Sequence, residues 1–474
     1  MKSLGPAFNR MWGASVLTNL ADGVLIAAAP LLAVSLTKNP VLISAISALV
    51  MLPWLLFAIP IGAIVDRVDR RFLLAGANSI RCVIAALIAL AISTNTITIY
   101  WLLLATFLIG ICEVTADTTS QSLIPQILDK SQFEKGNSRF QISETVIQGF
   151  IGTPISGFLY ALAIYLPFVV NSLGFAVAAV LAASIPVKFL QDIRSEEIAD
   201  KKPDFIAEMK FGIHYLYNNK PLLRLVVTTA SIGLCYSMAT STIILFILDE
   251  LNLKPSLFGL ALTIIGSGAI LGGLLAPKLS SKFGRSSVMA FCIFMSSFLL
   301  LLEGFSPNIY VYIALATFGS FTISIWNILI MATYQSVIPG HLFGRIHGTR
   351  RTIVWGLMPF GSLLGGFLAK GGLRLPLLIG GTIATVIALL SLRFLLHGLT
   401  TATIEEAGEA GEKSPLARAV DLLYYEHRYK SHAQARLCPV ALIGSIRADS
   451  YHQKRLWGRS TLHRRFYLSL KEDL

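Results

Sequence analysis

Twelve apolar runs fill most of this 474-residue chain, and each is long enough to cross a lipid bilayer. A helix needs about 20 apolar residues to span about 30 Å of hydrocarbon. Backbone N–H and C=O groups find no water in that region, so runs of this kind fold as helices. The pattern therefore predicts an all-α membrane protein with twelve transmembrane helices. The predicted spans are 11–36, 40–65, 72–94, 97–119, 140–163, 165–187, 222–248, 256–279, 286–305, 308–334, 347–369 and 373–396.

The composition excludes several other classes of protein. Charged residues make up 14% of the chain, against about 25% in soluble domains. The net charge of +13 comes from Lys and Arg in the connections between apolar runs, which is typical of a membrane protein and not of a nucleic-acid-binding face. The five cysteines form no C-x-x-C motif, and the histidines show no metal-ligand spacing. We expect no cofactor, no metal, no enzyme activity and no nucleic-acid partner.

The placement of basic residues predicts the orientation and the domains. Lys and Arg concentrate in alternate connections and in the segment 188–221, and such residues favour the cytoplasmic side. Both termini are then cytoplasmic, in a multi-pass protein of the inner or plasma membrane, and we expect a monomer. The predicted domains are a six-helix bundle at 1–187, a cytoplasmic linker with an amphipathic helix at 188–221, a second six-helix bundle at 222–396, and a cytoplasmic tail of unknown role at 397–474.

The two predicted bundles are related by internal repeats. The segment Gln121–Pro125 (QSLIP) recurs as Gln335–Pro339 (QSVIP), 214 residues later. In addition, Gly152–Leu159 aligns with Gly361–Leu368. Repeated halves are typical of secondary transporters, which bind their solute near the midplane between the halves.

A short charged segment joins the second and third apolar runs, and its residues Gly62, Asp66, Arg67, Arg70 and Arg71 resemble the loop after the second helix of the major facilitator superfamily. Further shared motifs are Asn19-x-x-Asp22, Asn78-x-x-Arg81 and Gln121-Ser-x-Ile-Pro125. Residues from about 10 to 396 resemble the bacterial exporter branch that includes the enterobactin exporter and macrolide efflux proteins. The resemblance implies two pseudo-symmetric six-helix bundles that expose a solute site alternately to the two sides.

Three charged residues inside the spans are candidates for coupling protons to a solute. A charge at the centre of a bilayer costs roughly 2.5–3.5 kcal/mol on insertion scales. From the rise of a helix, Asp22 lies roughly 16 Å deep in the first span and Arg81 roughly 14 Å deep in the third. Matching depths permit an Asp22–Arg81 ion pair, either as a coupling device or as a fixed structural pair. Glu113 in the fourth span is a candidate proton carrier, or else a cavity-wall residue.

The other candidates concern a gate and a cavity. In the superfamily an acid at the place of Asp117 commonly pairs with the charged loop, so we expect Asp117 to contact Arg70 or Arg71. Asp69 stands where the superfamily often has glycine. Asn19, Asn327 and Gln335 are candidate cavity residues, and of the tryptophans Trp54 and Trp326 lie deepest. We find no carboxylate in the middle of a second-half span, which suggests that the first half handles protons and the second half shapes the cavity.

The fifth span carries Gly149, Gly152, Pro154 and Gly157, which resemble an exporter motif, with Thr153 and Phe158 in place of two glycines. We therefore predict a proton-coupled exporter of a small hydrophobic or amphiphilic solute of the drug or siderophore class, whose partners are the lipid bilayer, that solute and protons. The alternatives are a lysophospholipid or lipid transporter, a solute importer of the same fold, and a membrane sensor that transports nothing.

Overall fold

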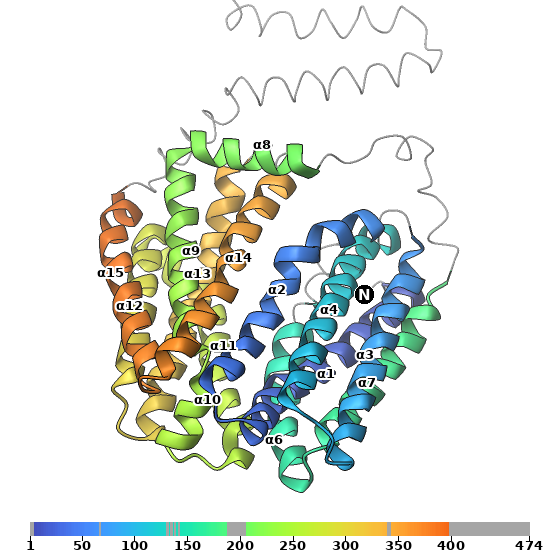
Figure 1. The fold of residues 1–474 in the computed structure, drawn as a ribbon. Coiled ribbons are helices and arrows are strands. Elements are labelled where there is room, and N and C mark those ends of the chain that lie inside the picture. The colour runs from blue at the N-terminus through green and yellow to red at the C-terminus, as the bar shows by residue number, and fades with distance from the viewer. Residues whose placement is uncertain are drawn as a thin grey trace, which may run out of the picture. The chain divides into compact units, whose positions relative to one another are not determined.

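The computed structural model describes residues 4–397, apart from 66–67, 129–131, 133–135, 137–138, 141–142, 187–204 and 339–342. Every regular element in the described ranges is a helix. Eleven of the helices found there are long and apolar enough to cross a membrane, and a shorter apolar helix covers Val146–Leu162. The predicted all-α membrane fold is therefore confirmed (Figure 1). The predicted tail lies outside the described residues, apart from His397.

The helices that precede the linker form a first helix group. Within it α1 packs against α7, η2 and α6, α3 packs against α4 and α7, and α2 packs against α4. The elements of this group are α1 (Pro6–Leu36), α2 (Pro40–Val65), α3 (Arg70–Ser93), α4 (Ile99–Ile127), η2 (Ser143–Gly152), α6 (Thr153–Leu162) and α7 (Leu166–Ala183).

The fifth predicted span is not one uniform helix. It consists of the π-helix η2 followed by the α-helix α6, and Pro154 stands in the first turn of α6. Proline has no N–H to donate, so it fits the first turn of a helix better than its interior. The Thr153 hydroxyl donates to the Gln148 carbonyl at 3.1 Å, across the junction. The change of helix type thus follows from the sequence around Pro154.

The helices that follow the linker form a second helix group. Here α11 packs against α13, α12 against α13 and α15, and α9 against α14 and α15. The elements are α9 (Lys220–Thr240), α10 (Ile243–Leu245), η5 (Phe246–Glu250), η6 (Pro255–Leu257), α11 (Phe258–Phe283), α12 (Arg285–Gly304), α13 (Ile309–Val337), α14 (Phe343–Ala369) and α15 (Leu375–His397).

The linker helix α8 (Phe205–Asn218) confirms the helix expected in the segment 188–221. It packs against α9 and α14, and Figure 1 shows it, in green, lying across one end of these helices. We call this end of the molecule the α8 side and the other end the opposite side. The spatial division into the predicted domains and the predicted cytoplasmic location of the α8 side remain predictions.

The two helix groups meet at several places. The helix α2 packs against α14, and α6 packs against α11. On the opposite side one apolar cluster combines Leu31 and Phe168 of the first group with Phe246 and Leu251 of the second. The ammonium of Lys38 also donates to Asp249 at 2.7 Å there. Residues of both groups therefore close the opposite side together.

Two neighbouring glycines of α11 give a test of the close packing between α11 and α13. A Cβ atom at Gly272 would collide with the Phe321 carbonyl oxygen, whereas one at Gly273 would lie 3.7 Å from the flexible end of Ile328. We predict that Gly272→Ala destabilises the protein by about 1–3 kcal/mol because a backbone must move. Gly273→Ala is the matched control and leaves stability unchanged or raises it. Denaturant unfolding in detergent measures both, and equal stabilities would contradict this packing.

Candidate functional site

An ion pair at the centre of the first helix group joins α1 to α3. The Arg81 guanidinium donates to Asp22 Oδ1 and lies 4.1 Å above the ring of Phe175 in α7. Arg81 is 1% exposed, and the Asp22 side chain is 17% exposed. The pair expected from the matching depths of these residues is therefore present. Each charge lowers the cost of burying the other.

Glu113 of α4 lies in the same electrostatic neighbourhood. It interacts with Asp22, Arg81, Asp117 and Glu144, and Arg81 is the cation among them. Among the described residues Glu113 forms no ion pair. Carboxyl groups this close to one another cannot all be charged without mutual repulsion. The cluster is thus suited to binding protons, whichever of its members holds them.

Arg351 of α14 connects this cluster to the second helix group. Its guanidinium lies 4.4 Å above the ring of Trp54 in α2 and 4.1 Å above the ring of Trp355 in α14. The two rings meet edge to face at 5.6 Å. Arg351 also interacts electrostatically with Asp117 and Glu144 of the first group. Arg351 therefore contacts both helix groups, and its position depends on the charges of Asp117 and Glu144.

The sequence analysis did not find this contact. A signal was present, because Arg350 and Arg351 both fall inside the predicted span 347–369. Arginines within a span face the interior of the bundle or a cavity far more often than lipid.

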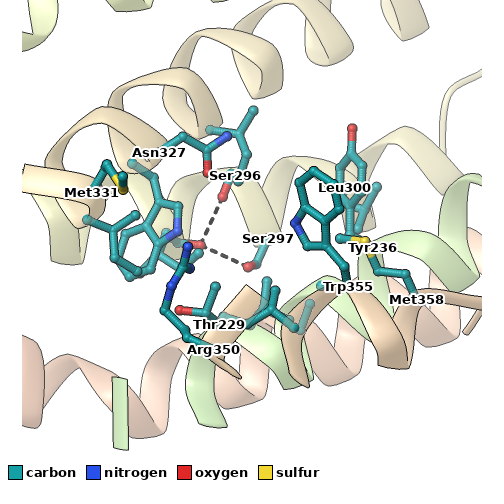
Figure 2. Close-up of a pocket in the computed structure, with 18 of the residues that line it drawn as sticks. Thr229, Tyr236, Ser296, Ser297, Leu300, Asn327, Met331, Arg350, Trp355 and Met358 are labelled. Atoms are coloured by element: carbon teal, nitrogen blue, oxygen red, sulfur yellow. Dashed lines mark hydrogen bonds between the residues drawn. The ribbon is translucent and has the colours of Figure 1, made fainter. Parts of the chain in front are cut away.

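A cavity of about 270 Å³ lies within the second helix group, between α9, α12, α13, α14 and α15. Figure 2 shows Arg350 and Met331 towards one side of it and Tyr236, Trp355 and Met358 towards the other. Arg350 is the charged residue among the described lining residues, and its guanidinium lies 4.3 Å from the Tyr334 ring centre. Apolar walls with a few polar groups are typical of small-molecule sites. The polar lining residues are Thr229, Tyr236, Ser296, Ser297, Asn327, Tyr334 and Arg350.

The three candidate cavity residues are placed differently. Asn327 lines the cavity, next to Trp326, which is 2% exposed. The Asn19 amide instead donates to the Ser15 carbonyl at 2.8 Å and to the Ser15 hydroxyl at 3.1 Å, on its own helix. Gln335 belongs to α13, but its side chain lies outside what the structure describes.

The charged loop contains an ion pair that the sequence analysis did not predict. Arg71 donates to Asp69 at 2.7 Å, and the Asp69 carboxylate also caps α3 by accepting from the Arg71 N–H at 3.0 Å. Asp117 interacts electrostatically with Arg81 and Arg351, and its expected contact with Arg70 or Arg71 stays a prediction. A partner two residues away costs little chain entropy to hold in place. The hydrogen bonds from Arg71 lower the pKa of Asp69 below its ordinary value.

The other residues of the charged loop and the glycines of the exporter-like motif differ in how closely other helices approach them. Asp66 and Arg67 lie outside the described residues, and Arg70 begins α3. A Cβ atom at Gly62 or Gly149 would meet nothing within 4 Å. A Cβ at Gly152 would lie 2.8 Å from Cα of Gly23 in α1, and one at Gly157 would lie 3.0 Å from the Ser256 carbonyl of the second group. Two glycines of the motif thus permit close helix approach, one of them between the groups.

One buried acid was not singled out by the sequence analysis. Glu303 is the penultimate residue of α12, so a search of the middle of each span passes over it. Its side chain is nevertheless buried, with 7% of the residue exposed. Buried acids are therefore not confined to the first helix group, and the suggestion that the first half handles protons stays a prediction.

The chain is similar to known membrane transporters. A family model described as Major Facilitator Superfamily matches residues 11–360 and 225–450. Macrolide efflux protein A of Streptococcus pyogenes is 21% identical over 387 residues, which cover 81% of this chain and 94% of that protein. Macrolide efflux protein A of Enterococcus faecalis is 21% identical over 324 residues, 68% of this chain and 98% of that protein.

Solved structures share the fold at low identity. A crystal structure of the nucleoside transporter NupG has a TM-score of 0.61 at 13% identity and covers 83% of this chain and 100% of its own. A bacterial homologue of the iron transporter ferroportin, in an inward-facing state, has a TM-score of 0.65 at 13% identity and covers 82% of this chain and 99% of its own.

The buried ion pair gives a stability prediction. Arg81→Gln leaves the Asp22 charge without its partner, and we predict a loss of about 3–5 kcal/mol in the free energy of unfolding. Lys38→Gln breaks an exposed pair and costs less than about 1 kcal/mol. In the double variant Asp22→Asn with Arg81→Gln no charge is left unpaired, so it is more stable than Arg81→Gln alone. Denaturant titration in detergent compares them, and equal losses for the Arg81 and Lys38 variants would refute the assignment.

Asp69 gives a pH prediction. Because its pKa is lowered in the folded state, its charge stabilises the fold above the ordinary titration range of aspartate. This stabilisation is lost as the pH falls below that range through the lower pKa of the folded state. Asp69→Asn keeps a capping side chain. We predict that this variant is less stable than the wild type at neutral pH and that the difference shrinks in acid, as measured by thermal unfolding. Arg71→Gln should flatten the same pH dependence; a pH-independent difference would contradict the pairing.

Proposed function

The chain belongs to the major facilitator superfamily of transporters, which are not enzymes, and from this premise we propose that it is a proton-coupled exporter of a small hydrophobic or amphiphilic solute. The observation that carries the proposal is a series of electrostatic interactions and ring contacts that leads from the acidic cluster to the cavity. Asp117 and Glu144 interact with Arg351, Arg351 lies on Trp355, and Trp355 lines the cavity.

The coupling follows from the charges along this path. When Asp117 and Glu144 are charged, they attract Arg351 and hold the two helix groups together beside Trp54. When protons neutralise them, the attraction is lost and Arg351 can move with Trp355. The shape of the cavity then changes with proton binding. In this proposal Asp22 and Glu113, beside Arg81, take up the protons and pass them to Asp117, whose loss of charge acts on the second helix group through Arg351.

The lining of the cavity supports the solute class. Two tryptophans, Trp326 and Trp355, and two methionines, Met331 and Met358, offer large and adaptable apolar contacts. Hydroxyl and amide groups of Ser296, Ser297 and Asn327 can orient polar groups on the solute. The volume of about 270 Å³ suits a small solute or one part of a larger one. A macrolide is the first compound to test, because macrolide efflux proteins are among the relatives that match much of this chain.

Two features support export by alternating access. The opposite side is closed by the apolar cluster and by the Lys38–Asp249 pair, so a cycle must open it. Gly157 of the exporter-like motif lies against the second helix group, where α6 and α11 separate in such a cycle. We propose that the groups 1–187 and 222–396 move as two domains of a monomer. The α8 side then faces the cytoplasm, with both termini, in a bacterial cell membrane.

The test is solute accumulation in everted membrane vesicles with an acidic interior. Four radiolabelled or fluorescent probes cover the solute classes: erythromycin, ethidium, enterobactin and a lysophospholipid. We predict that vesicles with the wild-type protein accumulate at least one probe and that a protonophore abolishes this. The double variant Asp22→Asn with Glu113→Gln should keep solute exchange without a gradient but lose gradient-driven accumulation, because the carboxyl groups that bind protons are gone.

The matched control keeps both carboxyl groups, as Asp22→Glu with Glu113→Asp, and should retain gradient-driven accumulation. Coupled accumulation by the neutral double variant at the wild-type level would overturn the assignment of Asp22 and Glu113. Accumulation of no probe by the wild type, in vesicles that contain folded protein, would overturn the proposed exporter function.

A further inference from the structure

A buried carboxyl group of the second helix group lies just beyond the cavity. Glu303 is 7% exposed, and a Cβ atom added to Gly319 would lie 3.4 Å from its Oε1 atom. Gly319 is ten residues into α13, which corresponds to about 15 Å from the start of that helix. Helical side chains point back toward the N-terminus of their own helix. The carboxyl group therefore reaches from the end of α12 into the helix group.

Among the described residues, the titratable groups that interact with Glu303 are tyrosines, and none of them is a cation. Glu303 interacts electrostatically with Tyr236 of α9 and Tyr312 of α13. Arg374, just before α15, is held by Glu250 at 2.7 Å and by the carbonyls of Gly304 and Ser306 at 2.9 and 3.1 Å.

The basic residues of the helices packed against α12 stand elsewhere. They belong to the last turns of α11 and α15 and the first turns of α9, at the α8 side, and are Lys220, Arg224, Lys278, Lys282, Arg393 and His397. Among the described residues Glu303 thus has no ion-pair partner.

Three helix faces connect Glu303 to the cavity. On α12, Ser296, Leu300 and Glu303 follow one another at helical spacing, and the first two line the cavity. On α9, Tyr236 both lines the cavity and interacts with Glu303. On α13 the cavity-lining Trp326 shares its face with Gly319. Glu303 therefore lies at the end of the cavity nearest the opposite side.

We propose that Glu303 is a second proton-binding site, which takes up a proton and releases it once in each transport cycle. The proton comes from water on the opposite side and leaves through the cavity past Tyr236, whose phenol can both accept and donate a proton-bearing hydrogen bond. Water that reaches Glu303 while the opposite side is open supplies the proton, and because no cation partner is present among the described residues the neutral form is retained as that side closes. Water that enters the cavity from the α8 side then accepts the proton and solvates the charged form. Nothing is consumed besides the proton that crosses.

This inference rests on the proposed function for its transport test. We predict that Glu303→Gln still exchanges solute without a gradient but couples about one proton fewer to each solute. Its steady-state accumulation should then fall about tenfold for each pH unit of gradient, because one fewer proton drives each solute molecule. The measurement uses the everted vesicles above, with the probe that the wild type accumulates, and a pH-sensitive dye that counts protons.

The matched control is Glu250→Gln, the same substitution on the same side of the second helix group, at a glutamate already paired with Arg374. It should leave the proton-to-solute ratio unchanged. A second readout needs no solute: infrared spectroscopy of the purified full chain in lipid, from mildly acidic to mildly alkaline pH. We expect the C=O stretching band of a protonated carboxyl group that titrates in the wild type and is missing in Glu303→Gln.

The outcomes separate this inference from the proposed function. A wild-type ratio in Glu303→Gln, or an infrared band that does not change with pH, would overturn the role of Glu303 and leave the exporter proposal intact. A titrating Glu303 band in a protein that accumulates no probe would support the proton site and overturn the exporter. If Glu303→Gln does not fold, Glu303→Asp and the wild-type infrared titration still decide the question.

Discussion

The cost of an unpaired charge among apolar helices organises the centre of this protein. Arg81 is paired with Asp22 and lies over the ring of Phe175, and Arg351 lies against the rings of both Trp54 and Trp355. Both arginines interact with residues of other helices, so these interactions also constrain how the helices pack. Arg351 contacts both helix groups and interacts electrostatically with Asp117 and Glu144, so charges of the first group act on a residue of the second.

Close contacts between backbones are the second constraint. Gly272 of α11 lies against the Phe321 carbonyl of α13, and Gly157 of α6 lies against Ser256 of the other group. In a bilayer no hydrophobic force drives helices together, so the close packing that glycine allows contributes much of their association. The first contact stabilises one helix group, whereas the second lies where the proposed cycle must separate the groups. In that proposed cycle, glycine serves both permanent and reversible helix contacts.

Several features of the site could be predicted from the sequence, and others could not. The pairing of Asp22 with Arg81 follows from their matching depths, since a helix advances a fixed distance per residue. The contact of Arg351 with Trp54 needed the packing of α2 against α14, which hydropathy does not reveal. Asp69 captures Arg71 because it caps α3 two residues away, a local detail that the resemblance to the superfamily obscured. Glu303 was not predicted, because it stands near the end of α12 and the search considered only carboxylates in the middle of a span.

By itself the sequence determined that the chain forms membrane-spanning helices, that its halves repeat, and how deep its charged residues lie. These properties depend on composition, length and the rise along one helix axis. The tertiary structure alone decided which charges meet, where the cavity lies and which acid has no cation beside it. Such facts depend on the direction each side chain takes around its helix and on which helix is its neighbour, and both are set by packing between residues far apart in the chain.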